Sequence, residues 1–475
     1  MKKHNLYKIF AALLMIFVIT ACSEEKMNEI DTNPNSPTDV PLSLLMPQAT
    51  IDIPVTVSGI DLSWYSSVFV EHTTGAHAQL RAADRRTAEI NPTTGNNQWN
   101  SFYAGVIPNL NVIIEKTGPD GTEPGRYVHM GIAKVMKAYT VARITDTWGD
   151  VPYTQAWQGS ANRAPEYDTQ EFIYTQVLQQ LLDEAIADLQ TETVYNPGTT
   201  DLIFGGDVDR WIKTAYGLKA RYLQRLSNTT HYSASAVIAA ANNSFTNRAE
   251  EFTFRNFTEA PTGQHTWYQE SNLRKHHVFS KQVYDLLNDR EDPRLPVWIA
   301  PVAGTDTVFN PAPNGDAQND QGGTIYSKAS SNIVYATAPL EMMTYEEVLF
   351  IKAEAYLGSN MATAKEYYVA GITSAMERYG VDAADIQAFL DNEDVLPAGN
   401  LTLEHIITQK YLAFWLYNPV EAFNDYRRTG FPEMTNVIGP PPHRFPYPQS
   451  EYDSNSDNVP LGPETIYTVK LWWAL

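Results

Sequence analysis

Apolar residues recur at helical spacing through most of the chain, and this periodicity constrains the fold more than any other feature. One such stripe consists of Leu178, Leu181, Leu182, Ala185 and Leu189. A capping box, Asp168 followed by Glu171, precedes this stripe and predicts where its helix begins. The same spacing predicts further helices over residues 126–147, 208–227, 344–356, 402–417 and 418–430. The sequence therefore predicts a mostly α-helical fold.

Two consecutive helices form a predicted hairpin in the C-terminal part. Thr344 and Glu347 form a capping box before the first helix, and the second, from about residue 361, stops at Gly380. The second helix carries a small-aromatic-small rhythm: Ala364, Tyr368 and Gly371. This rhythm is typical of tetratricopeptide repeats, although no strict 34-residue period runs through the chain. We therefore expect tetratricopeptide-like helix pairs.

A different composition separates the helical parts. Residues 243–338 are rich in proline and in Asn-Gly-Asp turns, and only 278–287 resembles a helix. This predicts an irregular, loop-rich capping subdomain between an N-terminal helical part, 41–242, and a C-terminal one, 339–475. Prolines after Gly439 predict that the tail is extended chain packed over the helices.

The N-terminus has the features of a bacterial export signal. Three lysines precede an apolar run, Ile9 to Ile19, that is too short to span a bilayer. The run ends in small residues before Cys22, the one cysteine of the chain, as in the lipobox of lipoprotein precursors. We expect cleavage of residues 1–21, lipidation of Cys22, and a flexible leash over 22–40. A lipid is then the expected contact with the membrane.

The charge balance excludes one class of partner. The chain has 55 acidic and 34 basic residues and a formal net charge of −21. A general nucleic-acid binder needs a surface rich in Lys and Arg to contact phosphates. No nucleic-acid partner is therefore expected, and with 43% apolar residues the chain can bury a large core.

Several longer stretches resemble a known family. They are Thr145-Asp146-Thr147-Trp148-Gly149-Asp150-Val151-Pro152-Tyr153, Pro165–Asp168, Gly206-Asp207 with Trp211, Asp292–Leu295, Glu347–Ala355, Gln409–Tyr411, Asp425–Pro432 and Arg444–Pro448. In this order they resemble the SusD/RagB family of nutrient-binding outer-membrane lipoproteins of Bacteroidetes, in its second large subgroup. The resemblance covers nearly the whole mature chain.

The resemblance implies a fold, a place and a partner. Family members combine tetratricopeptide-like helix pairs with an irregular capping region. They lie on the outside of the outer membrane as a lid on a SusC-like TonB-dependent transporter. They bind oligosaccharides or, in the RagB branch, peptides, and pass them to the transporter. Ser23-Glu24-Glu25 looks like the acidic signal that sends such lipoproteins to the cell surface. The matching stretches hold scaffold residues and no ligand motif.

Aromatic residues with polar neighbours are therefore the candidate ligand contacts, because a flat ring can bind the C–H face of a pyranose. Four groups qualify: Trp64, Tyr65 and His72; Asn97, Trp99 and Tyr103; Trp267 and Tyr268; Arg294 and Trp298. Large rings are more often core than site. Expected loop positions favour Trp99 and Trp267 as ligand contacts, whereas Trp148 and Trp415 are expected to be structural.

The sequence patterns for a metal site or a catalytic site are weaker than those for ligand binding. Asp453, Asn455, Asp457 and Glu464 follow the spacing of a calcium loop, but Pro460 and Pro463 interrupt it. No nucleophile motif, phosphate loop or dinucleotide motif is found, and no cofactor or metal is expected. A surface glycoside hydrolase with paired carboxylates is left as the alternative to a non-catalytic binding protein.

Overall fold

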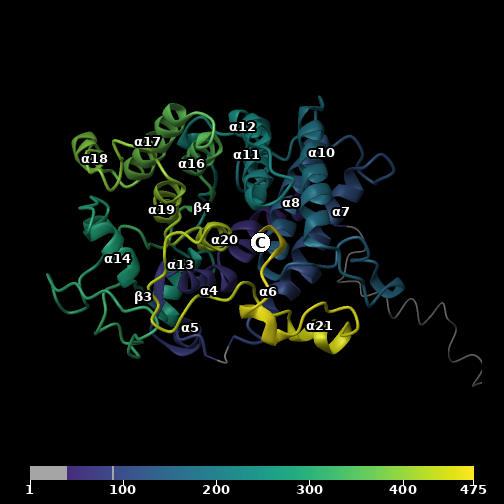
Figure 1. Cartoon of the computed structure of the whole chain (residues 1–475). Helices are drawn as coiled ribbons and strands as arrows, with labels where there is room; N and C mark the ends of the chain where they lie inside the picture. Colours follow the sequence, from purple (N-terminus) through teal and green to yellow (C-terminus); the bar gives the residue numbers. More distant parts are fainter. Residues whose placement is uncertain (1–39, 88–89, 475) are drawn as a thin grey trace, which may run out of the picture. The chain divides into compact units, whose positions relative to one another are not determined.

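The computed structural model describes residues 40–87 and 90–474 (Figure 1). The predicted signal segment 1–21, Cys22 and all of the leash except residue 40 lie outside these residues. The chain divides into two compact units, Met1–Leu45 and Met46–Leu475. Of the first unit only residues 40–45 are described, and they include the start of the first described helix. The second unit is described by itself below.

Helices dominate the described chain. The first half contains α3 (Leu42–Asp52), α4 (Asp61–Phe69), α5 (Ala78–Asp84), α6 (Asn96–Ser101), α7 (Ile107–Thr117), α8 (Tyr127–Trp148), α9 (Gln170–Phe172), α10 (Leu178–Gln190), α11 (Val208–Arg225) and α12 (Ala234–Asn242). The second half contains α13 (Thr266–Gln269), α14 (Lys281–Asn288), α15 (Leu295–Trp298), α16 (Tyr345–Tyr356), α17 (Met361–Glu377), α18 (Ala383–Leu390), α19 (Leu403–Ala413), α20 (Pro419–Thr429) and α21 (Gln449–Ser454). The mostly α-helical fold predicted from the sequence is confirmed.

Shorter elements connect these helices. The π-helical turns are η1 (Ile53–Val57), η2 (Phe102–Val106), η4 (Ile173–Val177) and η8 (Glu270–Arg274). The 3₁₀ turns are η3 (Gly159–Ala161), η5 (Gly198–Thr200), η6 (Leu226–Asn228), η7 (Arg248–Glu250), η9 (Pro463–Tyr467) and η10 (Trp472–Ala474). Turns η2 and η4 run without a break into the α-helices that follow them, so each lengthens a helix locally.

Most predicted helix boundaries hold. The side chain of Thr344 accepts a hydrogen bond from the backbone N–H of Glu347 at 3.2 Å, and so caps α16. Gly430 ends α20 at a φ of 80°, which glycine adopts at little cost. One predicted cap is wrong by a residue. Thr169, not Asp168, caps α9, because the carboxylate of Asp168 bonds a different loop.

The helices pack as successive pairs within the second unit. Helix α8 packs on α7 and α10, α10 on α11, α11 on α12, α12 on α16, and α16 on α17 and α19. Small residues permit the close approaches. A Cβ built on Gly371 of α17 would lie 2.8 Å from Cε1 of Phe350 on α16, so a larger residue would separate the pair. The predicted tetratricopeptide-like pairing is confirmed for α16 and α17.

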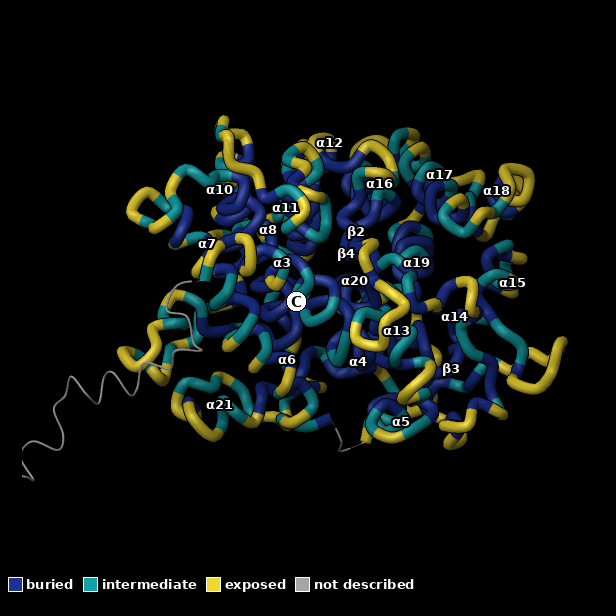
Figure 2. Tube along the Cα trace, turned by 180° about the vertical axis from the view of Figure 1, so that it is seen from behind, coloured by how far each residue is buried: buried dark blue, intermediate teal, exposed yellow. Residues whose placement is uncertain are grey.

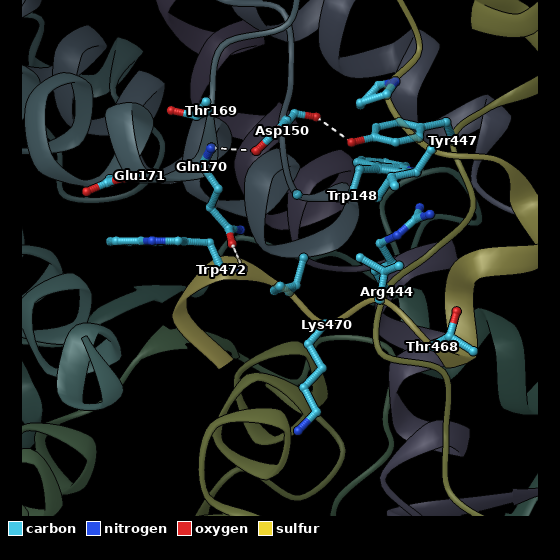
Figure 3. A pocket seen from close by; sticks show the side chains of 15 residues that line it. Trp148, Asp150, Thr169, Gln170, Glu171, Arg444, Tyr447, Thr468, Lys470 and Trp472 are labelled. Atoms are coloured by element: carbon cyan, nitrogen blue, oxygen red, sulfur yellow. Dashed lines mark hydrogen bonds between the residues drawn. The ribbon is translucent and has the colours of Figure 1, made fainter. Parts of the chain in front are cut away.

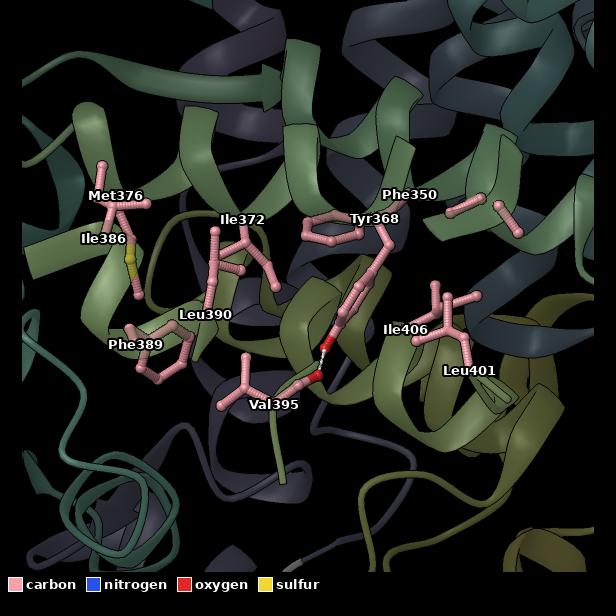
Figure 4. Close-up of a cluster of buried hydrophobic side chains, with 12 residues drawn as sticks. Phe350, Tyr368, Ile372, Met376, Ile386, Phe389, Leu390, Val395, Leu401 and Ile406 are labelled. Carbon is pink, nitrogen blue, oxygen red and sulfur yellow. Dashed lines mark hydrogen bonds between the residues drawn. The ribbon is translucent and has the colours of Figure 1, made fainter. Parts of the chain in front are cut away.

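A compact apolar cluster holds this hairpin to its neighbours (Figure 4). Phe350 of α16 meets Tyr368 and Ile372 of α17, and Phe389 of α18 completes the contact. The Tyr368 hydroxyl donates a hydrogen bond to the backbone oxygen of Val395 at 2.8 Å. A buried tyrosine hydroxyl needs a hydrogen-bond partner. Tyr368, the aromatic residue of the tetratricopeptide-like pattern, therefore also holds the chain after α18 in place.

The segment 243–338 is joined to both of its neighbours by short strands. Strand β2 (Phe252–Phe254) pairs antiparallel with β4 (Leu340–Met343), and β3 (His277–Phe279) pairs antiparallel with β1 (Thr73–Gly75). Because residues 277–279 are a strand, the helix predicted from 278 begins at Lys281 instead. The predicted division into parts remains a prediction.

The C-terminal tail is less extended than predicted. It contains α21, η9 and η10; Pro448 directly precedes α21 and Pro463 begins η9, positions where a missing N–H is tolerated. The backbone N–H of Phe445 donates to the oxygen of Thr147 at 2.9 Å and ties the tail to the end of α8.

Buried ion pairs between side chains connect helices that are distant in the sequence. Arg221 of α11 binds Glu347 of α16 at 2.6 Å, and Arg143 of α8 lies 3.0 Å from Glu421 of α20. Figure 2 shows α8 and α20 as largely buried tubes. Burial alone would raise the pKa of Glu421, but the guanidinium groups of Arg221, Arg225 and Arg143 outweigh it and hold the pKa far below its usual value.

Candidate functional site

The structure buries most of the side chains predicted to contact a ligand. Seven of them are between 0 and 9% exposed: Trp64, Tyr65, His72, Trp99, Trp267, Arg294 and Trp298. Asn97 is exposed, and Tyr103 and Tyr268 are half-buried. The expected loop positions of Trp99 and Trp267 are wrong, because these residues lie on α6 and α13. A ring whose two faces are covered has no surface to offer a sugar.

Trp64 and Trp267 come together around one histidine. The ring of Trp267 lies 4.9 Å from that of His277, and Nε2 of His277 lies 3.3 Å from the backbone oxygen of Trp64. Glu270 contacts the other ring nitrogen of His277 at 3.0 Å. The adjacent cavity, lined by Trp267 and His277, has a volume of about 20 Å³. That is room for one water and not for a sugar.

Arg294 and Trp298 belong to the core. The guanidinium group of Arg294 binds Asp292 at 2.6 Å and donates to Gln409 at 3.0 Å. Trp298 stacks on Trp415 with ring centroids 4.4 Å apart and planes 10° from parallel. Both side chains are fully buried, so they hold α15 against α19 and the residues that follow it.

His72 and Tyr65 also pack inside the fold. Nε2 of His72 lies 2.9 Å from the backbone oxygen of Tyr411, and burial lowers the pKa of His72 to about 3. The ring of Tyr65 lies edge-on to Phe445 at 6.2 Å. Both side chains therefore join helix α4 and its end to the C-terminal part.

A ladder of rings leads from the core to the surface. Buried Trp99 stacks on Tyr103 at 4.5 Å, and Tyr103 stacks on Trp157 at 5.4 Å with planes 15° apart. Tyr153 lies edge-on to Trp157 at 5.8 Å. Tyr103, Tyr153 and Trp157 are all half-buried, and we call these three the ring shelf. Trp99 and Trp157 stack on Tyr103, so Tyr103 supports the shelf, and Tyr153 and Trp157 supply the partly open aromatic surface of the kind that carbohydrate rings contact.

The loop that carries the shelf is fixed at its base. Val151 and Asp168 exchange two backbone hydrogen bonds of 3.0 Å. The carboxylate of Asp168 also accepts from the backbone N–H groups of Tyr153 and Thr154, at 2.9 and 2.7 Å. These bonds order the loop, so the position of Tyr153 is set before any ligand arrives.

Trp157 has an uncommon backbone conformation. Its φ is +60°, a region that bulky residues rarely adopt. Its indole N–H donates to the backbone oxygen of Tyr103 at 3.0 Å, which holds the ring parallel to the Tyr103 ring. Such backbone strain is concentrated at functional sites, where the surrounding structure maintains it.

A lysine completes the shelf. Nζ of Lys137, on α8, lies 5.3 Å from the ring centroid of Tyr153 and 5.7 Å from that of Trp157. At these distances an ammonium group is attracted to the negative face of a ring. Lys137 and Trp157 were not among the predicted site residues. A signal for Trp157 was present, because Gln158-Gly159-Ser160 after it is typical of an exposed loop.

A larger cavity lies beside the C-terminal segment (Figure 3). Its volume is about 620 Å³, and its walls include Trp148, Tyr447, Leu471 and Trp472. Polar groups in its walls already bind other parts of the protein. The side-chain amide of Gln170 accepts a hydrogen bond from the backbone N–H of Trp472 at 2.9 Å and donates one to the backbone oxygen of Thr145 at 2.7 Å. The cavity has room for a ligand, but these groups already hold the C-terminal segment in place.

Comparison with known proteins decides the family. The family described as "Starch-binding associating with outer membrane", of SusD-like proteins, matches residues 34–448. The chain belongs to the SusD-like family. A comparison with curated proteins finds no match. The predicted resemblance is confirmed.

Solved structures support this SusD-like fold. A SusD/RagB family protein from Bacteroides thetaiotaomicron is 29% identical, with a TM-score of 0.82, over 92% of this chain and 99% of its own. A chitin-binding protein is 24% identical, with a TM-score of 0.74, over 90% and 100% of the two chains. A chitin-binding SusD homolog from Flavobacterium johnsoniae is 19% identical, with a TM-score of 0.74, over 91% and 98%.

The stretches that resemble the family form scaffold in this SusD-like chain. Glu347 binds Arg221 inside the helix layer, and Asp425 binds Lys410 at 2.8 Å. Trp148 and Trp415 are at most 1% exposed, as predicted for structural rings. The shared stretch that ends at Tyr153 leads directly into the shelf loop, so scaffold and shelf are contiguous in the sequence.

The calcium-loop pattern does not form a loop in the SusD-like fold. Asp453 lies inside α21 and accepts a hydrogen bond from Gln449, whereas Glu464 lies in η9. Among residues 40–87 and 90–474, no group of three carboxylate, histidine or cysteine side chains is placed to hold a metal. Within the same residues no helix combines the length and apolar character needed to cross a bilayer.

Proposed function

We propose that the chain binds oligosaccharide at the cell surface and passes it, uncleaved, to a SusC-like TonB-dependent transporter. The observation that carries this proposal is the ring shelf. Tyr153 and Trp157 present half-buried rings on a loop that is closed by Asp168 and stacked on the core through Tyr103. A sugar placed against such rings gains apolar contact without ordering a mobile loop.

The relatives support a carbohydrate ligand. The family description names starch binding and association with the outer membrane, and two of the similar structures are named as chitin-binding. Peptide binding, as in the RagB branch, is the other ligand class implied by the resemblance. No feature of the shelf favours a peptide, since stacked rings match pyranose faces better than they match an extended backbone.

A direct test uses the soluble protein from residue 23 onward. We expect it to bind members of a glycan array and to leave a parallel peptide library unbound. Chromatography of the bound oligosaccharide after incubation should show no shorter products. Selective peptide binding would replace the glycan ligand by a peptide, and turnover of a molar excess of oligosaccharide would make the protein a hydrolase.

The proposal includes a lipid anchor at Cys22 and an outward-facing position in the outer membrane. We expect Cys22→Ala to yield a folded protein that is either unanchored or left uncleaved, because acylation supplies the membrane affinity of the mature protein. Membrane fractionation tests this. It is done in cells that lack the SusC-like transporter, so that docking on the transporter cannot retain the variant at the membrane. Retention of the mature variant in the outer membrane would contradict the anchor.

A further inference from the structure

Lys137 differs from the lysine one helical turn before it. Nζ of Lys134 forms ion pairs with Glu184 and Asp188 on α10, at 2.9 and 2.8 Å. For Nζ of Lys137, no carboxylate within 4.0 Å and no hydrogen-bond acceptor is found in the described part of the chain. Its ammonium group lies instead over the rings of Tyr153 and Trp157 in the ring shelf. Helix α8 therefore carries two different lysines: Lys134 forms ion pairs with α10, whereas Lys137 is unpaired and lies beside the ring shelf.

The surroundings of Lys137 leave its charge uncompensated. Burial lowers the pKa of Lys137, and the carboxylates of Glu115 and Glu184 counteract this only in part, from beyond ion-pair distance. Glu184 is already bound to Lys134. A half-buried ammonium without a direct partner is unfavourable, because it loses hydration without gaining an ion pair. The rings of Tyr153 and Trp157 attract the charge but accept no strong hydrogen bond.

We propose that the ring shelf binds an acidic saccharide, with the sugar ring against Trp157 and its carboxylate or sulfate hydrogen-bonded to Lys137. This inference rests on the proposed function and specifies the class of glycan. Nζ lies 5.3 and 5.7 Å from the two ring centroids. An anionic oxygen about 2.8 Å from Nζ would therefore lie beside a sugar stacked on the shelf.

The negative net charge of the chain does not prevent this. At physiological ionic strength, exposed charges more than about 8 Å apart are largely screened. The local contact with Lys137 then matters more than the sum of distant carboxylates. The long-range repulsion slows association but leaves the contact itself in place.

The test uses pairs of probes that differ only in charge. An oligogalacturonate is compared with its methyl ester, and sulfated oligosaccharides with their desulfated forms, within a panel that also holds neutral glycans. We expect the tightest binder to be acidic and to bind roughly tenfold or more tightly than its neutral counterpart. Lys137→Met, which keeps the length of the side chain, should abolish this preference, and Lys137→Arg should retain it.

Lys352→Met is the matched control, because Lys352 is also a half-buried lysine over an aromatic ring, that of Tyr367, but lies on α16 and not beside the shelf. It should leave the acid preference unchanged. If the tightest binder is neutral, or if Lys137→Met keeps the preference for acid, the inference is wrong while glycan binding stands. If no saccharide of either kind binds, the proposed function falls together with it.

Discussion

The substitution Trp99→Ala should destabilise the fold strongly, although Trp99 resembles a surface ring in the sequence. Trp99 is 2% exposed and contacts Tyr103 at 4.5 Å and Trp148 at 5.0 Å. A tryptophan of this kind buries roughly 200 Å², which corresponds to about 5 kcal/mol as an upper bound. Truncation also leaves a cavity that close-packed neighbours cannot fill. The free energy of unfolding should fall by about 3 to 5 kcal/mol.

The loss of unfolding free energy in Trp99→Ala is compared with that in Trp157→Ala, because Trp157 lies at the outer end of the same series of stacked rings. Its ring is half-buried, so water fills the space left by truncation and no cavity term arises. We expect a loss of about 1 to 2 kcal/mol. Urea unfolding followed by far-ultraviolet circular dichroism measures both variants without relying on tryptophan fluorescence. Equal losses for the two variants, or a loss below about 2 kcal/mol for Trp99→Ala at an unchanged m-value, would refute the reasoning.

Three further predictions concern the scaffold. Glu421→Gln should cost about 3 to 5 kcal/mol of unfolding free energy, because it leaves buried guanidinium groups without their anion, and a smaller loss in urea unfolding would contradict this. Acid should destabilise the fold below about pH 4, where the unfolded chain protonates Glu421 and Asp425, whose folded pKa values are lowered, that of Asp425 to about 2. At higher pH the lowered pKa of His72, about 3, favours destabilisation below about pH 6.5, but the raised folded pKa values of Asp52, about 6, and Asp84, about 7, oppose it. Unfolding free energies that stay flat from pH 4 to pH 2 would refute this. Gly131→Ala should destabilise by about 1 to 2 kcal/mol, since its Cβ would lie 2.6 Å from a side chain of α10, whereas Gly105→Ala has open space and should be neutral or slightly stabilising in thermal unfolding.

The helices could be predicted because their signals are local. Thr344 caps α16 through a neighbour three residues away, and Gly430 ends α20 through its own φ angle. The π-helical turn η4 and the shifted start of α14 could not be predicted this way. The start of α14 depends on β3, which exists only because β1, some 200 residues earlier in the chain, lies beside it. Local spacing carries no information about such a partner.

The binding surface was harder to predict for the same reason. Trp99 stands in a polar stretch that suggests a loop, but Trp148 and Tyr447 cover it from distant parts of the chain. Trp157 follows the family stretch that ends at Tyr153 by four residues, and none of the four groups predicted from the sequence includes it. Whether a ring is open or covered depends on tertiary contacts, and the sequence shows only the ring. Of the predicted group around Trp99, Tyr103 alone became part of the shelf.

The affinity of the shelf for sugar tests the central claim most directly. With the glycan that binds the soluble protein most tightly, calorimetry compares the unmodified protein, Trp157→Ala and Trp472→Ala. Trp472 is the matched control, because it is also half-buried but lines the C-terminal cavity. We predict that Trp157→Ala weakens binding by about 1 to 3 kcal/mol, roughly 5- to 150-fold, and that Trp472→Ala leaves the affinity unchanged. Unchanged affinity in Trp157→Ala, with a loss in Trp472→Ala, would place the ligand in the C-terminal cavity and contradict the account.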